Sequence, residues 1–314
     1  MCIRDSTNIA DALQGRVAGV NVISNGGPGS APVVRVRGYS STNGNDPLYV
    51  VDGVQTTDAN VLRDINPNDI ENISVLKDGA AAIYGARASN GVIVVTTKTG
   101  EYNSENTLEV NALMTVSEIM PYPKNMNLGQ HADMIWQSRL NDGQSPSHPQ
   151  YGSGSFPIIP NFLNIPYPAE YGEGGAQVTP GGTDWMDEIT QAATSYQASI
   201  AASGGGEQGR YRMSLNYRDM EGVLNYTGFE SLSARLNSEL KIGKSLTIGQ
   251  KINATYDKEQ YGTGDAVEYA SQASPLVPVY DTNGNFSGAY SNSTGLSNDP
   301  VSYTHLRAHE TTHD

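Results

Sequence analysis

Residues 194–260 alternate between apolar and polar side chains with a period of two, and this pattern constrains the fold more than any other feature of the chain. One run places Tyr211, Met213, Leu215 and Tyr217 on one face and Arg210, Arg212 and Arg218 on the other. Four successive runs of this kind are longer than the usual globular strand of about five or six residues. The segment is therefore predicted to form antiparallel hairpins, with the tyrosine-bearing face outward on the lipid side and the arginines inward.

Alternation alone does not separate a transmembrane barrel from a soluble sandwich, because both have one polar face. The polar face here also carries Arg235, Glu239, Lys241 and Lys251. Strand length favours the barrel. Hydrophobic residues make up only 37% of the chain, which is low for a compact soluble domain. Tyr (18) outnumbers Phe (4), which suits a membrane interface and an ordinary β-protein equally. No stretch of the sequence has the 18 or so apolar residues of a membrane-spanning helix.

Charge and cysteine content exclude two further classes of protein. The formal net charge is −14 and Lys and Arg are scattered singly, so the chain lacks the basic face that a nucleic-acid binder needs. Cys2 is the single cysteine, which rules out a disulfide framework or a cysteine-based metal site within one chain.

The first hundred residues have a different sequence pattern, in which short predicted strands alternate with short predicted helices. Apolar residues Ile9, Leu13, Val17 and Val20 lie on one helical stripe. Strands are predicted at 33–38, at 47–54 with a turn at Asp52-Gly53, at 73–77 and at 91–98, the last apolar on both faces and therefore buried. Asn66 begins a short helix, and a second helical segment spans 80–84. These signals predict a compact mixed α/β domain.

The stretch between the two regions has fewer patterns that predict secondary structure. Residues 107–116 alternate as a strand with two distinct faces, and residues 127–140 form a helix pattern with Leu128, Ile135 and Trp136 apolar. Residues 141–183 are rich in Gly, Pro, Ser and Tyr and are predicted to be a long loop. A helical turn is expected from Trp185 to Ile189.

Four stretches of the first hundred residues resemble the plug domain of SusC/RagA-family TonB-dependent receptors. They are NIADALQGRVAGVNV, VRVRGYSS, PLYVVDGV and INPNDIENISVLKDGAAAIYGARASNGVIVVTTKTG, and the last, from Asn66 to Gly100, is the most specific. The resemblance covers nearly all of residues 7–300. It implies a mainly β fold with little helix, in which a mixed α/β plug is followed by the first antiparallel strands of an incomplete transmembrane β-barrel.

The resemblance also implies a function and partners. Members of this family import large nutrients, of the oligosaccharide or peptide class, across the outer membrane of Bacteroidetes-type bacteria. They contact outer-membrane lipid, pair with a SusD-like surface lipoprotein and are driven by the TonB–ExbB–ExbD complex through the plug. No catalytic residue, cofactor or metal is implied, so the chain is not expected to be an enzyme.

Twelve residues match motifs of the family's plug, and internal turns and hydrogen bonds are the favoured explanation for them. They are Arg37, Gly38, Asp52, Gly53, Lys77, Asp78, Gly79, Tyr84, Gly85, Arg87, Asn90 and Gly91.

The chain departs from the family pattern at both ends. A signal peptide, an N-terminal carboxypeptidase-like domain, a TonB box and most strands of a barrel of about 22 are missing. The terminal segments resemble translated adapter sequence. The expected organisation is a non-native end at 1–6, the plug at 7–102, barrel strands and loops at 103–300 and a non-native end at 301–314, and a chain of this kind is expected to be a fragment that does not transport by itself.

Two other functions stay open at this point. A secreted or surface β-rich binding module would show the same alternation without a membrane. The run His309-Glu310-Thr311-Thr312-His313 has the spacing of the zincin metalloprotease motif, with His305 one helical turn earlier. The chain ends one residue after His313, and no apolar helix pattern surrounds the motif, so the zinc enzyme is the remote alternative.

Overall fold

The computed structural model describes residues 13–287, except 14, 16, 24–25, 37, 39–43, 123, 166–173, 263–264 and 285–286. The chain divides into two compact units. The first comprises the N-terminal residues through Ser117 with residues 193–222 and 227–260, and the second comprises residues 118–192, 223–226 and 261 onward. No helix among the described residues is long and apolar enough to cross a membrane.

The first part of unit 1, residues 13–103, is called the N-terminal region below. Its elements are β1 (Val20–Ile23), β2 (Val33–Val36), β3 (Leu48–Val51), β4 (Val54–Thr56), α2 (Asn60–Asp64), η1 (Pro67–Asp69), β5 (Ile70–Leu76), η2 (Asp78–Ala80), η3 (Ala82–Tyr84), η4 (Ala86–Ala88) and β6 (Val92–Thr97). β1 and β2 form an antiparallel pair, and the other strands form a sheet in the order β4-β3-β6-β5, in which β3 and β6 are parallel. The predicted mixed α/β domain is confirmed.

The two faces of this small sheet bury separate sets of side chains. Tyr49, Ile93 and Val95 pack with Leu62 on one face, whereas Leu48, Val50 and Val92 pack with Ala81 and Ala88 on the other. Strand β6 is therefore buried on both sides, as its continuous apolar sequence predicts. One local prediction was wrong, because Val20 lies in strand β1 and not on a helix. The predicted turn at Asp52-Gly53 is confirmed, and it separates β3 from β4. Ile9 lies outside the described residues.

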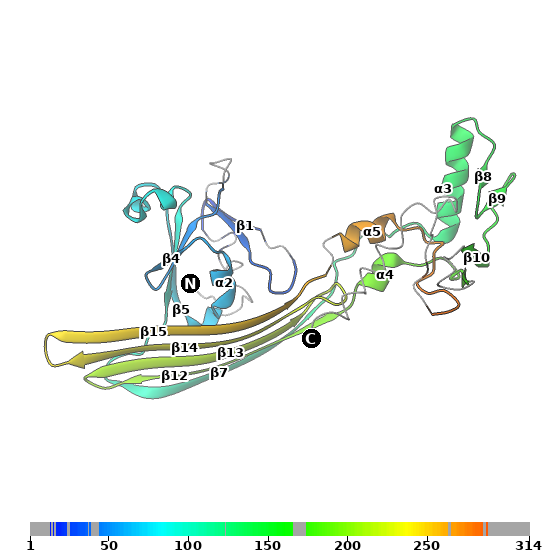
Figure 1. Ribbon diagram of the computed structural model, residues 1–314. Helices are drawn as coiled ribbons and strands as arrows, with labels where there is room; N and C mark the ends of the chain where they lie inside the picture. Colours follow the sequence, from blue (N-terminus) through cyan, green and yellow to red (C-terminus); the bar gives the residue numbers. More distant parts are fainter. Residues whose placement is uncertain are drawn as a thin grey trace. The chain divides into compact units, whose positions relative to one another are not determined.

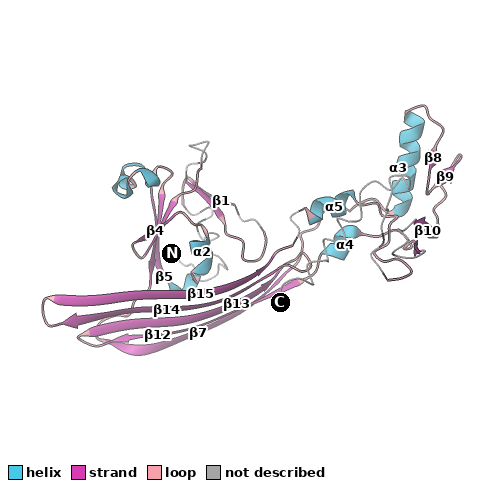
Figure 2. Cartoon of the chain, in the orientation of Figure 1, coloured by secondary structure: helices cyan, strands magenta, loops and turns pink. Residues whose placement is uncertain are grey.

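The second part of unit 1 is a five-stranded antiparallel sheet, called the long sheet below (Figures 1 and 2). Its strands are β7 (Ser104–Ser117), β12 (Ala193–Gly205), β13 (Gly209–Glu221), β14 (Gly228–Ile242) and β15 (Leu246–Gln260), in the order β15-β14-β13-β12-β7. The strands have 13 to 15 residues, well above the usual globular length. The predicted hairpins between residues 194 and 260 are confirmed.

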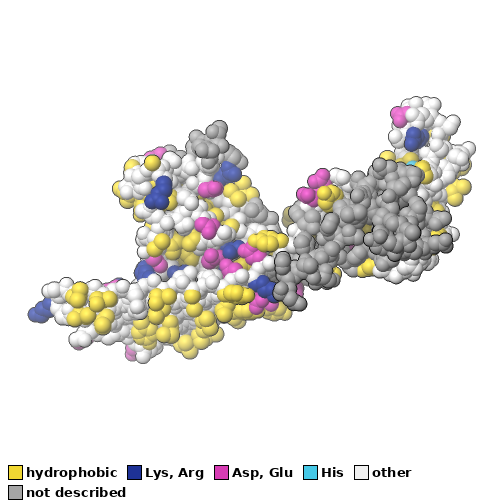
Figure 3. Space-filling model, viewed as in Figure 1, with side chains coloured by type: hydrophobic (Ala, Val, Ile, Leu, Met, Phe, Trp, Pro, Cys, Tyr) yellow, Lys and Arg dark blue, Asp and Glu magenta, His cyan; other side chains and the backbone are white. Residues whose placement is uncertain are grey.

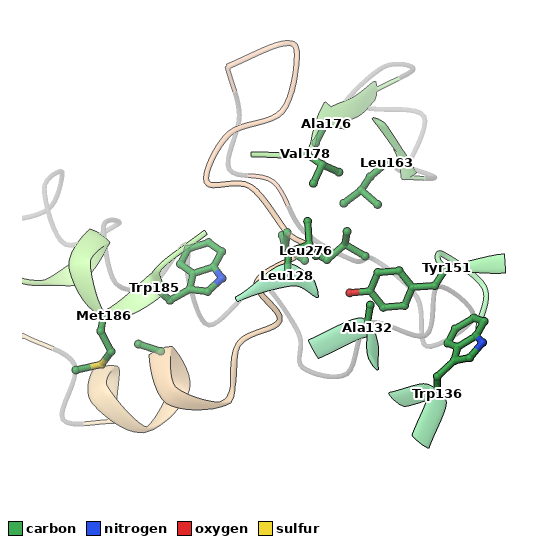
Figure 4. Packing of buried hydrophobic residues seen from close by; sticks show 12 residues of the cluster. Leu128, Ala132, Trp136, Tyr151, Leu163, Ala176, Val178, Trp185, Met186 and Leu276 are labelled. Carbon is green, nitrogen blue, oxygen red and sulfur yellow. The ribbon is translucent and has the colours of Figure 1, made fainter. Parts of the chain in front are cut away.

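Unit 2 has its own apolar core. Its elements are α3 (Leu128–Asn141), β8 (Ser147–His148), β9 (Gly152–Ser153), β10 (Phe162–Ile165), β11 (Gly174–Gln177), α4 (Trp185–Ile189) and α5 (Ala266–Gln272). Asn127 and Gln130 form a reciprocal capping box that starts α3. Tyr151, Trp136 and Leu163 pack with Leu128, Trp185 and Leu276 (Figure 4). The predicted loop 141–183 is thus wrong in part, because short strands within it bury Tyr151, Leu163 and Ala176.

Candidate functional site: the interface between the N-terminal region and the long sheet

The two faces of the long sheet differ in chemistry, and the N-terminal region covers the polar one. Met213, Leu215 and Tyr217 are exposed, whereas Arg212 and Arg218 on the same strand are buried. In Figure 3, apolar side chains cover the outer surface of this sheet, and acidic and basic groups gather where the sheet meets the N-terminal region. The predicted division of the tyrosines and arginines between two opposite faces is confirmed, and the contact with the polar face is the candidate site.

Asp69 makes the first deeply buried polar contact of this interface. Asn66 caps η1 by accepting a hydrogen bond from the Asn68 amide, which directs the last residue of η1, Asp69, at strand β13. Its carboxylate accepts hydrogen bonds from Ser214 Oγ at 2.6 Å and Asn216 Nδ2 at 3.0 Å. Arg212 Nη2 lies 3.6 Å from its other oxygen. A buried carboxylate needs such partners, and β13 supplies all three.

Asp52 makes a second contact, from the turn between β3 and β4. Asp52 and Gly53 both have positive φ, 50° and 92°, as a two-residue hairpin turn with an Asp-Gly sequence requires. The Asp52 carboxylate accepts hydrogen bonds from the Thr97 amide and hydroxyl and from Lys251 Nζ at 2.8 Å. Arg235 lies 3.6 Å away.

The charge state of Asp52 follows from these partners. Burial works to raise the pKa of its carboxyl, but the hydrogen bonds from Lys251 and Thr97 outweigh burial and hold that pKa below its ordinary value. Asp52 is thus anionic at neutral pH, opposite two cations of the long sheet.

Arg63 makes a third contact, with the charges reversed. It lies on the short helix α2, and its guanidinium pairs with Asp257, at 3.1 Å, and with Glu259, both on β15. Its guanidinium carbon also lies 5.1 Å from the ring centroid of Phe229 on β14. Burial works to lower the pKa of Arg63, but Asp64, Glu259 and Asp257 raise it above its ordinary value.

The fourth contact lies where the N-terminal region continues into β7. Asn237 Nδ2 donates to Thr97 Oγ1 at 3.0 Å and to the Lys98 carbonyl at 2.8 Å. Tyr102 donates to Glu239 at 2.6 Å, and Arg210 donates to the Gly100 carbonyl at 3.3 Å. A cavity of about 300 Å³ lies beside this contact and is lined in part by Arg210, Asn237 and Lys251. The first three contacts match charges of one surface to opposite charges of the other, and the fourth joins the two surfaces by hydrogen bonds.

The structure places the motif residues in two settings. Asp52 reaches the long sheet, and Gly53 completes its turn. The others lie within the N-terminal region: Lys77 donates to the Ala18 carbonyl, Arg87 to Gln55, and Asn90 to the Gly44 carbonyl. Asp78, Gly79 and Tyr84 lie in the 3₁₀ turns, Gly85 links η3 to η4, and Gly38 and Gly91 have positive φ. Arg37 lies outside the described residues.

Sequence reasoning missed Arg63, Asp69, Phe229, Asp257 and Glu259. The alternation of β15 continues through Asp257 and Glu259, so those two had a detectable signal. Arg63 and Asp69 lie on elements of five and three residues, too short for a periodic pattern.

No described residues form a group of three or more acidic, His or Cys side chains suited to a metal ion. His309 and His313 lie outside the described residues. The interface thus has the chemistry of a polar docking surface, built from ion pairs and hydrogen bonds.

Comparisons with known proteins agree on one family. The family described as TonB-dependent Receptor Plug Domain matches residues 3–92. TonB-dependent receptor P26 of Formosa agariphila is 33% identical over 290 residues, covering 90% of this chain and 26% of P26. TonB-dependent receptor SusC of Bacteroides thetaiotaomicron is 33% identical over 320 residues, covering 95% of this chain and 28% of SusC.

A solved structure shows the same relationship in three dimensions. The structure of the RagAB peptide transporter aligns with a TM-score of 0.69 and 28% identity, over 95% of this chain and 35% of that one. This chain therefore spans about a quarter to a third of the relatives that it matches. The matched plug family, the two receptors and the shared fold show that the chain belongs to the SusC/RagA family of TonB-dependent receptors.

Proposed function

We propose that this chain supplies the plug and the first barrel strands of a transporter that imports a large nutrient across the bacterial outer membrane. Residues 7–102 form the plug, and residues 103–300 form the first strands and loops of the barrel. The plug closes the lumen and is moved by the TonB–ExbB–ExbD complex. The observation that carries the proposal is the two-faced long sheet, with the N-terminal region on its polar face and apolar side chains on the other.

The apolar face has the composition that lipid requires. Ile200, Met213, Leu215, Leu232 and Ile252 are all at least 44% exposed. So many neighbouring exposed apolar residues are unusual for a soluble monomer. A row of charged residues lies at one end of this face, where Glu230 of β14 pairs in register with Asp219 of β13 on one side and with Lys258 of β15 on the other. The apolar area ends at this row. An apolar band with a polar border is typical of a lipid-facing barrel wall.

The apolar band also shifts along the strands from one strand to the next. On β7 the midpoint of the band is Ala112, which is in register with Tyr217 of β13. On β15 the midpoint is near Lys251, which is in register with Arg212 of β13. A shift of five residues over four strand spacings, at about 3.3 Å per residue and 4.8 Å per spacing, corresponds to a strand tilt of about 40°. Membrane barrels have strands tilted by about 35–45°, so the band supports a bilayer crossing the sheet at that angle.

The connections give the sheet an orientation. Short turns join β12 to β13 and β14 to β15, whereas the connection from β7 to β12 contains most of unit 2. Outer-membrane barrels have short periplasmic turns and long extracellular loops. Unit 2 is therefore assigned to the cell exterior, and the short turns to the periplasm.

The names of the relatives support a substrate class and a partner. RagAB is described as a peptide transporter, and SusC as a TonB-dependent receptor. An oligosaccharide or a peptide is the cargo proposed for this chain, with a SusD-like surface lipoprotein as the partner outside the cell. The proposed role requires no catalysis, because the plug acts by moving.

A chimera tests the proposal. Residues 7–300 replace the matching stretch of SusC from Bacteroides thetaiotaomicron, and the product is expressed in a strain without its own SusC. We expect an outer-membrane protein with heat-modifiable mobility that imports the SusC nutrient only when TonB is present. A matched chimera in which Leu215 and Leu232 are both changed to Arg should fail to insert. A chimera that stays in the periplasm as a folded soluble protein would contradict the proposal and favour the binding module.

A further inference from the structure

Arg63 joins three parts of the molecule at one end of the interface. Its Nη1 donates to the carbonyl of Gly29, at 3.2 Å, in the loop between β1 and β2. The same guanidinium pairs with Asp257 and Glu259 on β15 and lies over the ring of Phe229 on β14. Arg63 therefore ties helix α2 and the β1–β2 loop to two strands of the long sheet.

Phe229 lies between this group and a second arginine. Its ring centroid is 5.4 Å from the guanidinium carbon of Arg218 on β13, and the ring is almost completely buried. A Cβ added at Gly29 would overlap the Phe229 ring, so the loop backbone lies directly on it. The aromatic ring thus supports both Arg63 and the loop that Arg63 holds.

The opposite end of the interface is attached in a different way. Strand β6 ends at Thr97, and the chain enters β7 of the long sheet at Ser104. Lys98 and Gly100 are hydrogen-bonded to Asn237 and Arg210 within this short connection. The N-terminal region cannot leave the sheet at this end without breaking the chain or unfolding it.

The Arg63 contact is also more accessible to water than the Asp69 contact. The side chains of Asp257 and Glu259 are 18% and 19% exposed, whereas Asp69 and Arg212 are 4% and 6% exposed. Water can replace part of a partly exposed ion pair, but separating a more deeply buried pair leaves uncompensated charge. Exposure sets the Arg63 contact apart from the Asp69 contact. The Asp52 contact, whose partner Lys251 is 43% exposed, is set apart by connectivity, because Asp52 is hydrogen-bonded to Thr97 next to the connection into β7. The Arg63 end is therefore the end that separates at the lower cost.

From this geometry we infer that Arg63 is the positioning residue that latches the N-terminal region to the long sheet, and that this latch opens before the Asp69 and Asp52 contacts. The region then swings about the connection at residues 98–103. The inference rests on the proposed function only in taking the long sheet as the fixed barrel wall. Its test measures distances and not nutrient uptake, so the inference and the proposed function can fail separately.

Spin-label distances in the detergent-refolded chain test the latch. Cys2 is replaced by Ser so that labels attach only at introduced cysteines. One pair, Thr57→Cys with Lys258→Cys, spans the Arg63 end. A second pair, Glu71→Cys with Gln250→Cys, spans the other end. All four positions are exposed, so the labels displace no core side chain.

We expect both pairs to give narrow distance distributions in the parent chain. R63E should broaden and lengthen only the Thr57–Lys258 distribution, and R63M should do so to a smaller extent. The charge swap R63E/E259R should narrow it again. R87E is the matched control, because Arg87 bonds Gln55 within the N-terminal region, and it should change neither pair.

Four results would overturn the inference. R63E could leave both distributions narrow, which would show that Arg63 holds nothing. It could broaden both equally, which would make Arg63 a general stability residue. The swap could fail to restore the narrow distribution, which would exclude the ion pair as the cause. Broad distributions for both pairs in the parent chain would show that the interface itself does not form.

Discussion

Ser214 Oγ donates a 2.6 Å hydrogen bond to Asp69 Oδ2 and so joins the long sheet to the N-terminal region through two side chains with little access to water. The two residues are 145 positions apart in the sequence. A hydrogen bond to a charged group in such a place contributes more than an exposed one, because the alternative is an unsatisfied buried charge.

Replacing Asp69 by Ala should destabilise the N-terminal region strongly. The change leaves Ser214 and Asn216 buried without their acceptor, at about 1–3 kcal/mol for each unsatisfied group, and leaves Arg212 with Glu109 as its partner, at 3.1 Å. Amide hydrogen exchange of β5 and β6 measures the loss. Glu101→Ala is the control, because Glu101 is exposed. Equal exchange rates in both variants would show that Asp69 is not a principal contact.

Asp52 should make the interface sensitive to acid. The folded-state pKa of this carboxyl is lowered, so its stabilising effect is complete above the unfolded value of about 3.9 and is lost as the pH falls through the folded value. The Thr97 amide, which donates to Asp52 at 3.0 Å, should lose exchange protection in that range.

The matched variant for this test is Asp52→Asn. Asn tolerates the positive φ of 50° and still accepts the bond from Thr97, but it carries no charge. We expect the acid-dependent step to disappear in D52N, whereas D52A should add backbone strain. An acid step that persists unchanged in D52N would assign it to another carboxylate.

Gly29 should tolerate no side chain while Phe229 is present. Its φ of 67° costs a non-glycine residue about 1–2 kcal/mol, and overlap with the ring adds about 1–3 kcal/mol. Gly26→Ala is the control, because Gly26 has a similar φ of 73° but no atom within 4 Å of the added Cβ. In an F229G background, which removes the ring and also the Phe229 Cβ at 2.7 Å, G29A should cost no more than G26A, as measured by urea unfolding of the N-terminal region. The same large cost in that background would rule out the ring as the cause.

The sequence predicted the long sheet well because alternation is a local property. Each residue between 194 and 260 indicates its face from its neighbours, so Arg212 and Lys251 were assigned to the inner face without knowledge of what covers it. Asp52 was found through its motif, but its partners Lys251 and Arg235 were not. Such pairing depends on how two separately folded surfaces dock, and the period of a sequence pattern contains no information about docking. For the same reason Arg63 had no signal at all.

The error at residues 141–183 has a different physical origin. Gly and Pro are frequent there, which favours loops, yet strands of two to four residues suffice to bury Tyr151 and Leu163. Such strands are too short for alternation to show. Their stability comes from packing against Trp136 and Leu128, which are distant in sequence from β10 and β11.

A charge on the outer face of the long sheet should oppose insertion into lipid. Leu215→Arg places a guanidinium in the middle of the apolar band, where it costs about 2–4 kcal/mol. Asp219→Arg is the control, because Asp219 lies in the charged row opposite Glu230 and should cost about 0–1 kcal/mol. Both variants are made in the SusC chimera, and folding into lipid vesicles is measured. Equal folding yields would contradict a lipid-facing role for this surface.

Unit 2 should lose stability in mild acid through His131. His131 Nδ1 and Tyr151 Oη are hydrogen-bonded at 2.9 Å, and burial raises the pKa of Tyr151 to about 12, so the phenol stays protonated. Burial first, and the neighbouring His148 second, lower the pKa of His131. Protonation therefore favours the unfolded state: the stability is complete above the unfolded value of about 6.5 and falls as the pH drops from there through the folded value.

Both tryptophans of the chain, Trp136 and Trp185, lie in this core, so their fluorescence follows its unfolding. The urea midpoint of that signal should be lower at pH 5 than at pH 7.5, and His131→Gln, which has no charge at either pH, should remove most of the difference. An undiminished difference in H131Q would show that His131 does not titrate on unfolding.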